Sequence, residues 1–415
     1  MPNIHKQTDY DIVIAGGGMI GTSLGLALAP LNLKVAVVEA VARGADQQPS
    51  FDDRSTALSR SSQRMFEAMG LWPQIVAAST PIRNIHVSDK GRFGFAHIDA
   101  EEQKVEALGY VVINRVLGKV LQDSLLNVET LDFLCPAKIT AVTLDDDVAR
   151  VTVEDESGAS ELTTKLLVAA DGANSAVRDM IGISAKQVSY DQWAVIGNLL
   201  TEKKPDNRAF ERFTEAGPVA MLPVADDRAA FVWIQSPEQA KAVLALSDDE
   251  FTARIQDAFG RRLGRFSKVG KRAAYPLSLS KANGLISRRS VVLGNAAHGL
   301  HPVAAQGFNL GMRDVAALCD CIADARLHDG EQLDCGDAAI LENYAEWREP
   351  DHRKLVRFTD GIVHLFGDSR GPVRTLRNLG MLGFDLIPGV RRMFARHTMG
   401  LAGKLPRLSR GVPLE

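Results

Sequence analysis

The sequence predicts an α/β protein, α+β overall: a Rossmann-like domain with an inserted antiparallel sheet and a helical C-terminal region. Residues 11–39, DIVIAGGGMIGTSLGLALAPLNLKVAVVE, have the pattern of a strand, a glycine turn, a helix and a second strand. Residues 193–235 hold strand-length apolar runs separated by turn residues, without helices between them. Residues 307–325 and 338–366 have helical apolar patterns, and we expect Pro350 to interrupt the second.

Length and composition narrow the class of protein. A chain of 415 residues exceeds what one hydrophobic core usually supports, so we expect two domains or one domain with a large insertion. The net charge of −3 gives no sign of a nucleic-acid partner. No apolar stretch is long enough to span a bilayer, and the polar start lacks the features of a secretory signal, so we expect a cytoplasmic protein. The four cysteines lack the spacing of a zinc site, so we expect free thiols and no metal.

The glycine cluster near the start is the most specific local pattern. Gly16, Gly18 and Gly21 stand in G-x-G-x-x-G spacing directly after the strand predicted over 12–15. The first glycine allows a sharp turn, the second lets a pyrophosphate approach the backbone, and the third lets the helix lie close to the strand. Glu39 ends the second strand, 18 positions after Gly21, where a carboxylate can bind a ribose 2′-hydroxyl. The stretch therefore predicts a dinucleotide site; a merely structural glycine turn is the alternative.

Between this cluster and residue 170, apolar periodicity predicts two helices and several strands. The helices cover 57–69 and 115–126, and the strands lie within 82–95, 110–113 and 166–170. Arg54 lies just before the first helix, where a surface salt bridge with Asp53 is the alternative to a binding role. Arg115 begins the second helix. The last strand stops at Asp171-Gly172, and a strand that ends in this way invites a ligand at its carboxyl end.

The sheet predicted over 193–235 has one apolar, aromatic face, which includes Phe210, Phe231 and Trp233. Such a face could wall a pocket, and an ordinary sheet core is the alternative. A capped amphipathic helix is predicted next, over 248–259. The buried strand 291–293 then returns the chain to the first domain before Gly294.

The C-terminal segment 369–414 is basic, in contrast to the rest of the chain. It carries nine Arg or Lys residues and one acid, Asp385, with Leu, Met, Phe and Ile between them. This composition suits a membrane surface or an acidic partner, and a solvated basic face is the alternative.

Two further segments make the prediction more specific. They are LLVAADGANSAVR, residues 166–178, and VVLGNAAHGLHPVAAQGFNLGMRD, residues 291–314. With G-x-G-x-x-G they resemble, in order and spacing, the three fingerprints of the class A FAD-dependent aromatic monooxygenases. Within that class the chain is similar to the ubiquinone-biosynthesis hydroxylases, through AFERFTEAGPVAMLP, GKRAAYPL and GNAA…LHP…QGFNLGMRD. The resemblance covers nearly the whole chain.

The resemblance implies which residues bind the cofactor. Asp171 resembles the family's carboxylate that serves both FAD and the transient nicotinamide cofactor, and capping of the following helix is its alternative role. Residues 306–311 would present backbone amides to the flavin at a helix N-terminus. The expected cofactor-binding residues are Gly16, Gly18, Gly21, Glu39, Arg54, Arg115, Asp171, Gly172, Gly294, Asn295, Gln306, Gly307, Asn309 and Gly311. His298 and His301 are candidates for deprotonating a phenol, and ordinary structural hydrogen bonding is their alternative.

The chain departs from the common class pattern at two positions. It has Gly294-Asn295 where most members have Gly-Asp, and Asn295 can still hydrogen-bond a ribityl hydroxyl without bringing charge. It has Ala305 where many members have glycine, from which we expect that this position does not need a positive φ.

The resemblance also implies a reaction and its setting. Noncovalent FAD, with NAD(P)H as transient reductant and O2 as cosubstrate, would hydroxylate a polyprenylated phenol, 2-polyprenyl-6-methoxyphenol, to the 1,4-benzoquinol through a flavin C4a-hydroperoxide. A multiprotein quinone-biosynthesis complex is an expected partner. We expect peripheral contact of residues 369–415 with the inner face of the cytoplasmic membrane.

The expected domain division follows from the same motifs. The FAD-binding domain comprises 1–75, 111–182 and 286–368; the substrate domain comprises 76–110 and the antiparallel sheet of 183–285; the basic helical C-terminal region is 369–415.

Two other functions stay open on the sequence alone: an FAD-dependent reductase or dehydrogenase of the same fold, and a flavin-poor scaffold in a quinone-synthesis complex. Oxygen consumption matched to hydroxylated product would distinguish a monooxygenase from the reductase or dehydrogenase. The colour of the purified protein would show whether it is the flavin-poor scaffold.

Overall fold

The glycine-rich stretch forms the centre of the first sheet. Strand β1 (Tyr10–Ala15) leads through the glycines into helix α1 (Met19–Leu28), and the chain returns as β2 (Val35–Val38). Strand β1 pairs in parallel with β2 on one side and with β11 (Gly158–Ala169) on the other, and β19 (Ser290–Val292) pairs in parallel with β11. In this register Ala15 lies opposite both Val38 and Ala169. The carboxyl ends of these strands therefore meet at one edge, where ligands of open α/β sheets bind.

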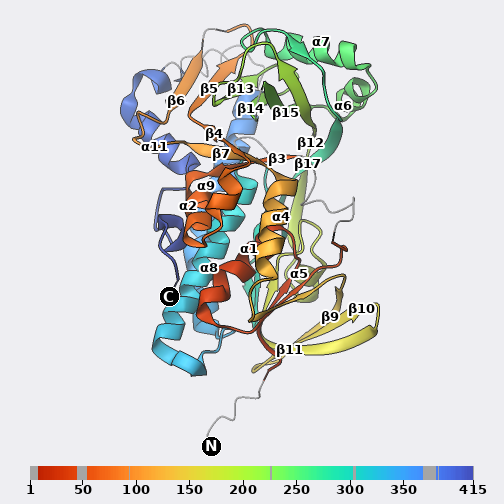
Figure 1. Ribbon diagram of the computed structural model, residues 1–415, viewed down its shortest axis with the longest axis vertical. Helices are drawn as coiled ribbons and strands as arrows, with labels where there is room; N and C mark the ends of the chain where they lie inside the picture. The colour runs from red at the N-terminus through yellow and green to blue at the C-terminus, as the bar shows by residue number, and fades with distance from the viewer. Residues whose placement is uncertain are drawn as a thin grey trace, which may run out of the picture.

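The computed structural model describes residues 8–43, 54–92, 94–224, 227–301, 305–367, 380–381 and 383–414. An eight-stranded sheet has the order β18-β19-β11-β1-β2-β8, with β10 and β9 extending it beyond β11. A nine-stranded sheet has the order β20-β17-β12-β15-β14-β13-β5-β6, with β16 beside β12. Figure 1 shows the first sheet and its helices in the lower half, the second sheet in the upper half, and the small sheet β3-β7-β4 between them. The α/β architecture is as predicted.

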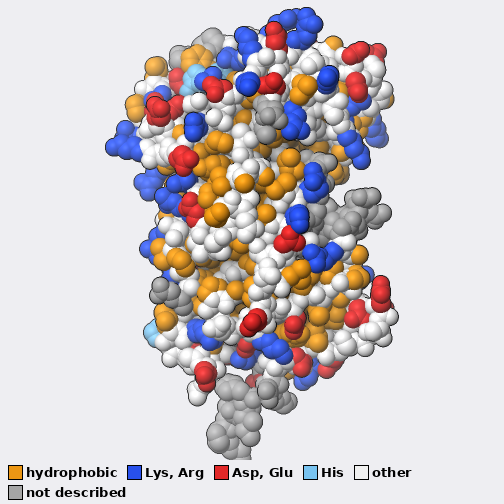
Figure 2. Space-filling view, in the orientation of Figure 1, with side chains coloured by type: hydrophobic (Ala, Val, Ile, Leu, Met, Phe, Trp, Pro, Cys, Tyr) orange, Lys and Arg blue, Asp and Glu red, His pale blue; other side chains and the backbone are white. Residues whose placement is uncertain are grey.

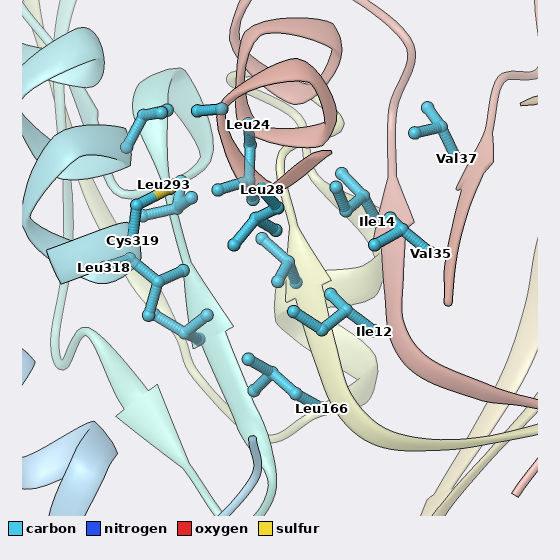
Figure 3. Packing of buried hydrophobic residues seen from close by; sticks show 14 of the residues in the cluster. Ile12, Ile14, Leu24, Leu28, Val35, Val37, Leu166, Leu293, Leu318 and Cys319 are labelled. Atoms are coloured by element: carbon cyan, nitrogen blue, oxygen red, sulfur yellow. The ribbon is translucent and has the colours of Figure 1, made fainter. Parts of the chain in front are cut away.

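Helix α1 packs against β1 and β2 of the first sheet, and α4 (Asn114–Leu125) and α8 (Gly307–Asp329) pack against α1. Helix α1 is buried on nearly all sides, so its small and apolar composition reflects burial between layers rather than a single wet face. Figure 3 shows Leu24 and Leu28 of α1 between Ile12 and Ile14 of β1 and Leu318 of α8. These side chains belong to one continuous core cluster.

The antiparallel sheet predicted over 193–235 is confirmed. Its central strand β12 (Ala185–Thr201) pairs with β15 (Arg228–Gln235) and β17 (Ala273–Ala282), and β14 (Val219–Pro223) continues the antiparallel order. Strand β13 (Arg208–Phe213) ends this run and pairs in parallel with β5 (Asn84–Asp89).

The aromatic face of this sheet is a core and not a pocket wall. Phe210, Phe231 and Trp233 are buried against Phe251 and Phe259 of the capped helix α7 (Asp248–Phe259). Helix α7 has the predicted bounds, because Ser247 and Glu250 form a complete capping box at its start.

The remaining elements have the following bounds. The helices are α3 (Trp72–Val76), α5 (Ala176–Met180), α6 (Pro237–Leu244) and α11 (Pro388–Thr398), and the strands are β4 (Ser79–Ile82), β6 (Phe95–Asp99), β7 (Gly109–Ile113), β8 (Leu131–Leu134), β9 (Lys138–Leu144), β10 (Ala149–Asp155), β16 (Phe266–Ser267), β18 (Ile286–Ser287) and β20 (His298–Gly299).

The helix predicted over 57–69 is wrong in its first part. Residues 55–59 form strand β3 (Ser55–Ser59), and helix α2 (Arg60–Ala68) begins only afterwards. Strand β3 forms because it pairs with β7, more than 50 positions later in the chain, with Ser55 opposite Ile113. The hydroxyl of Ser59 then caps α2 by accepting a hydrogen bond from the amide of Ser62.

The predicted interruption at Pro350 is also wrong, because α9 (Ala338–Gly367) runs through it. Arg348 and His352, on either side of the proline, both donate to Oδ1 of Asp314 on α8, at 2.7 Å each. These buried charged hydrogen bonds hold both halves of α9 on α8, which offsets the backbone hydrogen bond that the proline cannot make.

No helix within the described ranges is both long and apolar enough to cross a bilayer.

Replacing Asp314 should destabilise the fold strongly. Burial raises the pKa of this carboxyl, but His352, Arg348 and His298 outweigh burial and hold the pKa well below its usual range. Asp314→Asn leaves the buried Arg348 guanidinium without this charge, and we expect a loss of about 3 kcal/mol in the free energy of unfolding. Since the pKa is lowered in the folded state, the contribution is present above about pH 4 and is lost as the pH falls further.

Urea unfolding followed by circular dichroism measures this loss. Asp329→Asn, at an exposed carboxylate near the end of the same helix, is the matched control and should change stability by less than about 0.5 kcal/mol. Equal effects of the two substitutions would contradict the role of Asp314.

Candidate functional site

The glycine turn at the edge of the first sheet leaves no room for side chains. Gly16 has φ +100°, and a Cβ there would lie 2.6 Å from the carbonyl oxygen of Ala170. A Cβ on Gly21 would lie 1.9 Å from the carbonyl oxygen of Gly16. Gly18 is the N-cap of α1, and its carbonyl accepts the amide of Thr22 at 3.0 Å. The close approach of helix and strand expected from the motif is therefore present.

Glu39 lies directly after β2 and turns its carboxylate to the glycine turn. Oε2 accepts the Gly17 amide at 2.7 Å, and Oε1 accepts the Val41 amide at 2.8 Å. A carboxylate oxygen has two lone pairs, so each oxygen can also accept from a ribose hydroxyl.

Asp171-Gly172 follows β11 at the same edge of the sheet. The Asp171 carboxylate accepts hydrogen bonds from the Ser175 hydroxyl and, at 3.2 Å, from the Val177 amide at the start of α5. Ser175 itself is the N-cap of that helix. Asp171 thus supports the helix start, as its alternative role predicts, and Gly172 takes the turn with φ +94°.

Arg54 and Arg115 are brought together by the small sheet. The amide of Asn114 donates to the carbonyl of Arg54 at 2.8 Å, so the start of α4 lies beside the start of β3. The Arg54 guanidinium lies over the ring of Tyr275 on β17, 4.9 Å from its centroid, and Arg115 is exposed. The two cations therefore lie on neighbouring segments, as a shared cofactor contact requires. Asp53, the proposed salt-bridge partner, lies outside the described residues.

Gly294 and Gly311 allow a second close approach. Gly294 follows β19 and has φ +58°. A Cβ added to Gly311 of α8 would lie 3.2 Å from the Cα of Gly294. Both glycines also lie against Ile20 of α1. Asn295 is exposed next to this crossing, so its side chain is accessible at the edge where Gly16 and Glu39 also lie.

The start of α8 is fixed to α2 and β3 by the side chain of Asn309. Its Oδ1 accepts the Ser59 amide and the Ser62 hydroxyl, both at 2.8 Å, and its Nδ2 donates to the carbonyls of Ala57 and Ala305, both at 2.9 Å. Since the side-chain amide is fully used, Asn309 can contact a cofactor only through its backbone. Gln306 likewise donates to the carbonyl of Thr398, at 3.2 Å.

The expectation for Ala305 is wrong: this residue has φ +49°. The left-handed conformation turns the chain into α8 just before Gln306, the N-cap of the helix, and Gly307, its first residue. Alanine tolerates this conformation at a cost of about 1 kcal/mol, which glycine would avoid.

His298 and His301 are both buried, with 1% of each side chain exposed. His298 Nε2 lies 2.9 Å from Oδ2 of Asp314, and burial lowers the pKa of the imidazole. His301 Nε2 lies 3.1 Å from Oε1 of Gln192, and burial lowers its pKa to about 4. Both histidines are thus partnered inside the protein. This arrangement favours their structural alternative over direct deprotonation of a phenol.

Two residues near His301 were not predicted from the sequence. Tyr190 meets the His301 ring edge to face at 5.1 Å, and its hydroxyl donates to Asp360 at 3.4 Å. Gln192 lies on the same strand, β12, where pairing with β17 is irregular and Asp191 has φ +50°. Such bulges often turn side chains toward a functional site. The irregularity depends on the partner strand, so the sequence carries no signal for it.

The trio His298, Asp314 and His352 has ligand atoms within 4.8 Å of one another, as a metal site would. However, Arg348 Nε lies 2.7 Å from Oδ1 of Asp314, the oxygen that His352 also contacts. A guanidinium in that position repels a metal cation and already neutralises the carboxylate, so we interpret the trio as a structural hydrogen-bond network.

A polar cavity of 860 Å³ lies near the amino end of the parallel strands, on the other side of the sheet from the glycine turn. Two cations in its wall are paired, Arg289 with Asp334 at 2.7 Å and Lys165 with Asp11 at 2.8 Å. It is remote from every predicted site residue and we assign it no role.

The described residues fit an FAD molecule. The turn at Gly16 and Gly21 has no room for a Cβ, and the start of α1, where Gly18 is the N-cap, has no side-chain cap, so the first amides of this helix can face a pyrophosphate. Glu39, Asp171 and Asn295 add polar side chains at the same edge of the sheet, and α8 begins there. This donor and acceptor set matches the ribose, pyrophosphate and ribityl groups that the sequence motifs imply.

Adding a methyl group to Gly21 should expel the cofactor. Gly21→Ala places a Cβ 1.9 Å from a backbone oxygen, so α1 must move away from β1. We expect loss of bound flavin and about 2 kcal/mol of stability, measured by flavin absorbance per protein and by thermal unfolding. Gly361→Ala in α9, where a Cβ meets no atom within 4 Å, is the control. Full flavin retention by Gly21→Ala would refute this role of the turn.

Replacing Ala305 by glycine should stabilise the protein. Ala305→Gly removes the cost of the left-handed conformation, and we expect a gain of about 1 kcal/mol by urea unfolding. The same substitution at Ala253, exposed within helix α7, should instead lose about 1 kcal/mol. A loss at both positions would show that the conformation at 305 carries no strain.

Comparisons with known proteins identify the family of the chain. The family described as "FAD binding domain" matches residues 9–359. The chain is 36% identical to the ubiquinone hydroxylase UbiL of Rhodospirillum rubrum over 97% of this chain and 93% of the relative. It is 32% identical to the 3-demethoxyubiquinol 3-hydroxylase of Escherichia coli, over 94% of this chain and 98% of the relative.

A solved structure with the same fold is p-nitrophenol 4-monooxygenase PnpA from Pseudomonas putida DLL-E4. It has a TM-score of 0.78 and 18% identity, over 96% of this chain and all of that one. At this identity the likeness bears on the fold alone. The family match and the full-length relatives show that the chain belongs to the FAD binding domain family, as an FAD-dependent monooxygenase that uses O2 and NAD(P)H.

Proposed function

We propose that this enzyme hydroxylates 2-polyprenyl-6-methoxyphenol to the 1,4-benzoquinol in ubiquinone biosynthesis. The observation that carries the proposal is the 36% identity, over almost the full length of both chains, to a protein named a ubiquinone hydroxylase. The motifs at residues 209–223 and 270–277, which first suggested this subgroup, support the same conclusion.

The residues proposed to hold FAD come from the edge of the first sheet, from the small sheet and from the start of α8. The glycine turn would bind the pyrophosphate, Glu39 a ribose, and Asn295 the ribityl chain. Arg54 and Arg115 would contact the cofactor from the small sheet, and residues 306–311 would turn the N-terminus of α8 to the ring. When bound there, FAD supplies the redox chemistry, taking electrons from NAD(P)H and transferring one atom of O2 to the phenol ring.

His301 and His298 are proposed as positioning residues. Gln192 presents its Oε1 to His301 Nε2, so this nitrogen carries the proton and donates. With its pKa lowered to about 4, His301 is neutral at pH 7 and ties the loop before α8 to β12 of the second sheet. His298 ties the same segment to α8, because its Nε2 is hydrogen-bonded to Oδ2 of Asp314. The two histidines would thereby hold the segment before α8 against the second sheet and against α8.

The lipid-like substrate suggests where the enzyme works. A polyprenyl phenol is held in membranes, and a protein that acts on it needs contact with a bilayer or with a carrier. We propose a cytoplasmic enzyme held at the inner face of the membrane through residues 369–415, in a multiprotein quinone-biosynthesis complex. The basic residues of this segment support the proposal.

The test is turnover of a short-chain 2-prenyl-6-methoxyphenol in detergent by the flavin-loaded enzyme under 18O2. We expect NAD(P)H oxidation, oxygen uptake and formation of one 18O-labelled 1,4-quinol in equal amounts. The matched control is the same phenol methylated at the ring carbon para to its hydroxyl, which should give no quinol.

Other outcomes are equally decisive. A product labelled at another ring carbon would assign the enzyme to another step. NAD(P)H oxidation without label in any product would favour the reductase alternative, and a colourless purified protein would favour the scaffold.

A further inference from the structure

Helix α11 has apolar side chains on two faces, and only one face is covered. On the inner face, Phe394 and Ala395 pack with Ile98 and Ala100 of the β6 segment and with Leu108. Figure 1 shows α11 beside β6 at the outer edge of the second sheet. This packing accounts for the inner face alone.

Four large exposed side chains lie on the outer face of α11 and directly before it, and they are here called the α11 ridge. Leu386 is 70% exposed, Ile387 53%, Val390 37% and Met393 59%. Val390 and Met393, three positions apart, share one face of the helix, and Leu386 and Ile387 come immediately before it begins at Pro388. Single exposed apolar residues are common, but a contiguous ridge marks an interaction site.

Polar contacts fix which face of α11 points outward. Arg391 donates to Glu102 at 3.0 Å and to the carbonyl of Asp385, and the amide of His97 donates to the Asp385 carboxylate at 2.8 Å. These bonds tie α11 to the β6 segment, so the ridge is held away from the protein. Because Arg391 makes these contacts within the protein, we do not include it among the residues of 369–415 that are expected to contact a membrane.

The charged side chains of α11 itself are all basic. Arg392 and Arg396 are exposed on the same helix, and the sequence from 386 to 414 contains no Asp or Glu. Figure 2 shows Lys and Arg side chains, with acidic side chains among them, at the edge of the molecule where Figure 1 draws α11. Exposed apolar side chains beside cations complement an anionic lipid bilayer, whose headgroups are charged and whose interior is apolar.

We propose that the α11 ridge inserts into the headgroup region of an anionic lipid bilayer. Leu386, Val390 and Met393 would enter the acyl boundary, and Arg392 and Arg396 would contact lipid phosphates. A second copy of the chain is the rival occupant. A two-fold interface would oppose these cations to their own copies, and four side chains cover far less than the roughly 800 Å² per partner of a stable dimer. The proposal rests on the membrane contact proposed above for residues 369–415 and names the residues that make it; it is independent of which phenol is the substrate.

The experiment is co-sedimentation of the flavin-loaded enzyme with vesicles of neutral phosphatidylcholine, with and without 30% phosphatidylglycerol. We expect binding to the anionic vesicles, and about tenfold weaker binding when salt rises from about 0.05 to about 0.5 M, because salt screens the attraction between the cations and the lipid phosphates. Leu386→Ser with Met393→Ser should weaken binding by about tenfold or more, since two exposed apolar side chains lose their burial. Leu327→Ser is the matched control, because Leu327 is 73% exposed on α8.

A charge arm tests the cations separately. Arg392→Gln with Arg396→Gln should weaken anionic binding by about tenfold or more, whereas Arg265→Gln with Lys268→Gln, exposed near β16, should not. Wild-type protein that stays in the supernatant, or ridge variants that bind as well as Leu327→Ser, would overturn the proposal. So would a wild-type dimer that the ridge substitutions convert to a monomer. Turnover in detergent, measured on the same variants, reports the hydroxylase proposal separately.

Discussion

The structure depends on a backbone contact that only glycine permits. Helix α1 approaches β1 so closely that Gly21 meets the carbonyl of Gly16. This approach sets the position of α1, and α8 and α4 pack against α1 in turn. The second glycine crossing, of Gly311 on Gly294, repeats the same constraint between α8 and the end of β19. The edge of the sheet that holds the candidate site is therefore defined by two places where side chains are excluded.

The site itself is assembled from segments that are far apart in the sequence. Parallel pairing brings the ends of β1, β2, β11 and β19 to one edge, and each end is followed by a polar or glycine residue of the predicted set. The second sheet does not supply these residues. It adds Tyr275 beside Arg54, and Tyr190 and Gln192 beside His301, so the junction of the two sheets carries aromatic and amide groups from β12 and β17.

Local signals were sufficient to predict much of this arrangement. The glycine spacing predicted β1, α1 and β2, and the Ser247–Glu250 pair marked the start of α7, because these features depend on residues within a few positions. Contacts between distant segments were not predictable. Strand β3 exists because β7 pairs with it, and α9 passes Pro350 because Asp314 lies on α8. The positive φ of Ala305 follows from how the chain must enter α8, which residue type alone does not reveal.

The four hydrogen bonds of Asn309 have a consequence for chemical ageing. Its amide gives two donors to carbonyl oxygens and two lone pairs to Ser59 and Ser62, a combination that asparagine alone provides at this side-chain length. Deamidation to aspartate would set a carboxylate oxygen against the carbonyls of Ala57 and Ala305 and break the tie between α8 and β3. Deamidation at this buried position would thus disturb the start of α8, which is proposed to contact the flavin, while leaving the glycine turn intact.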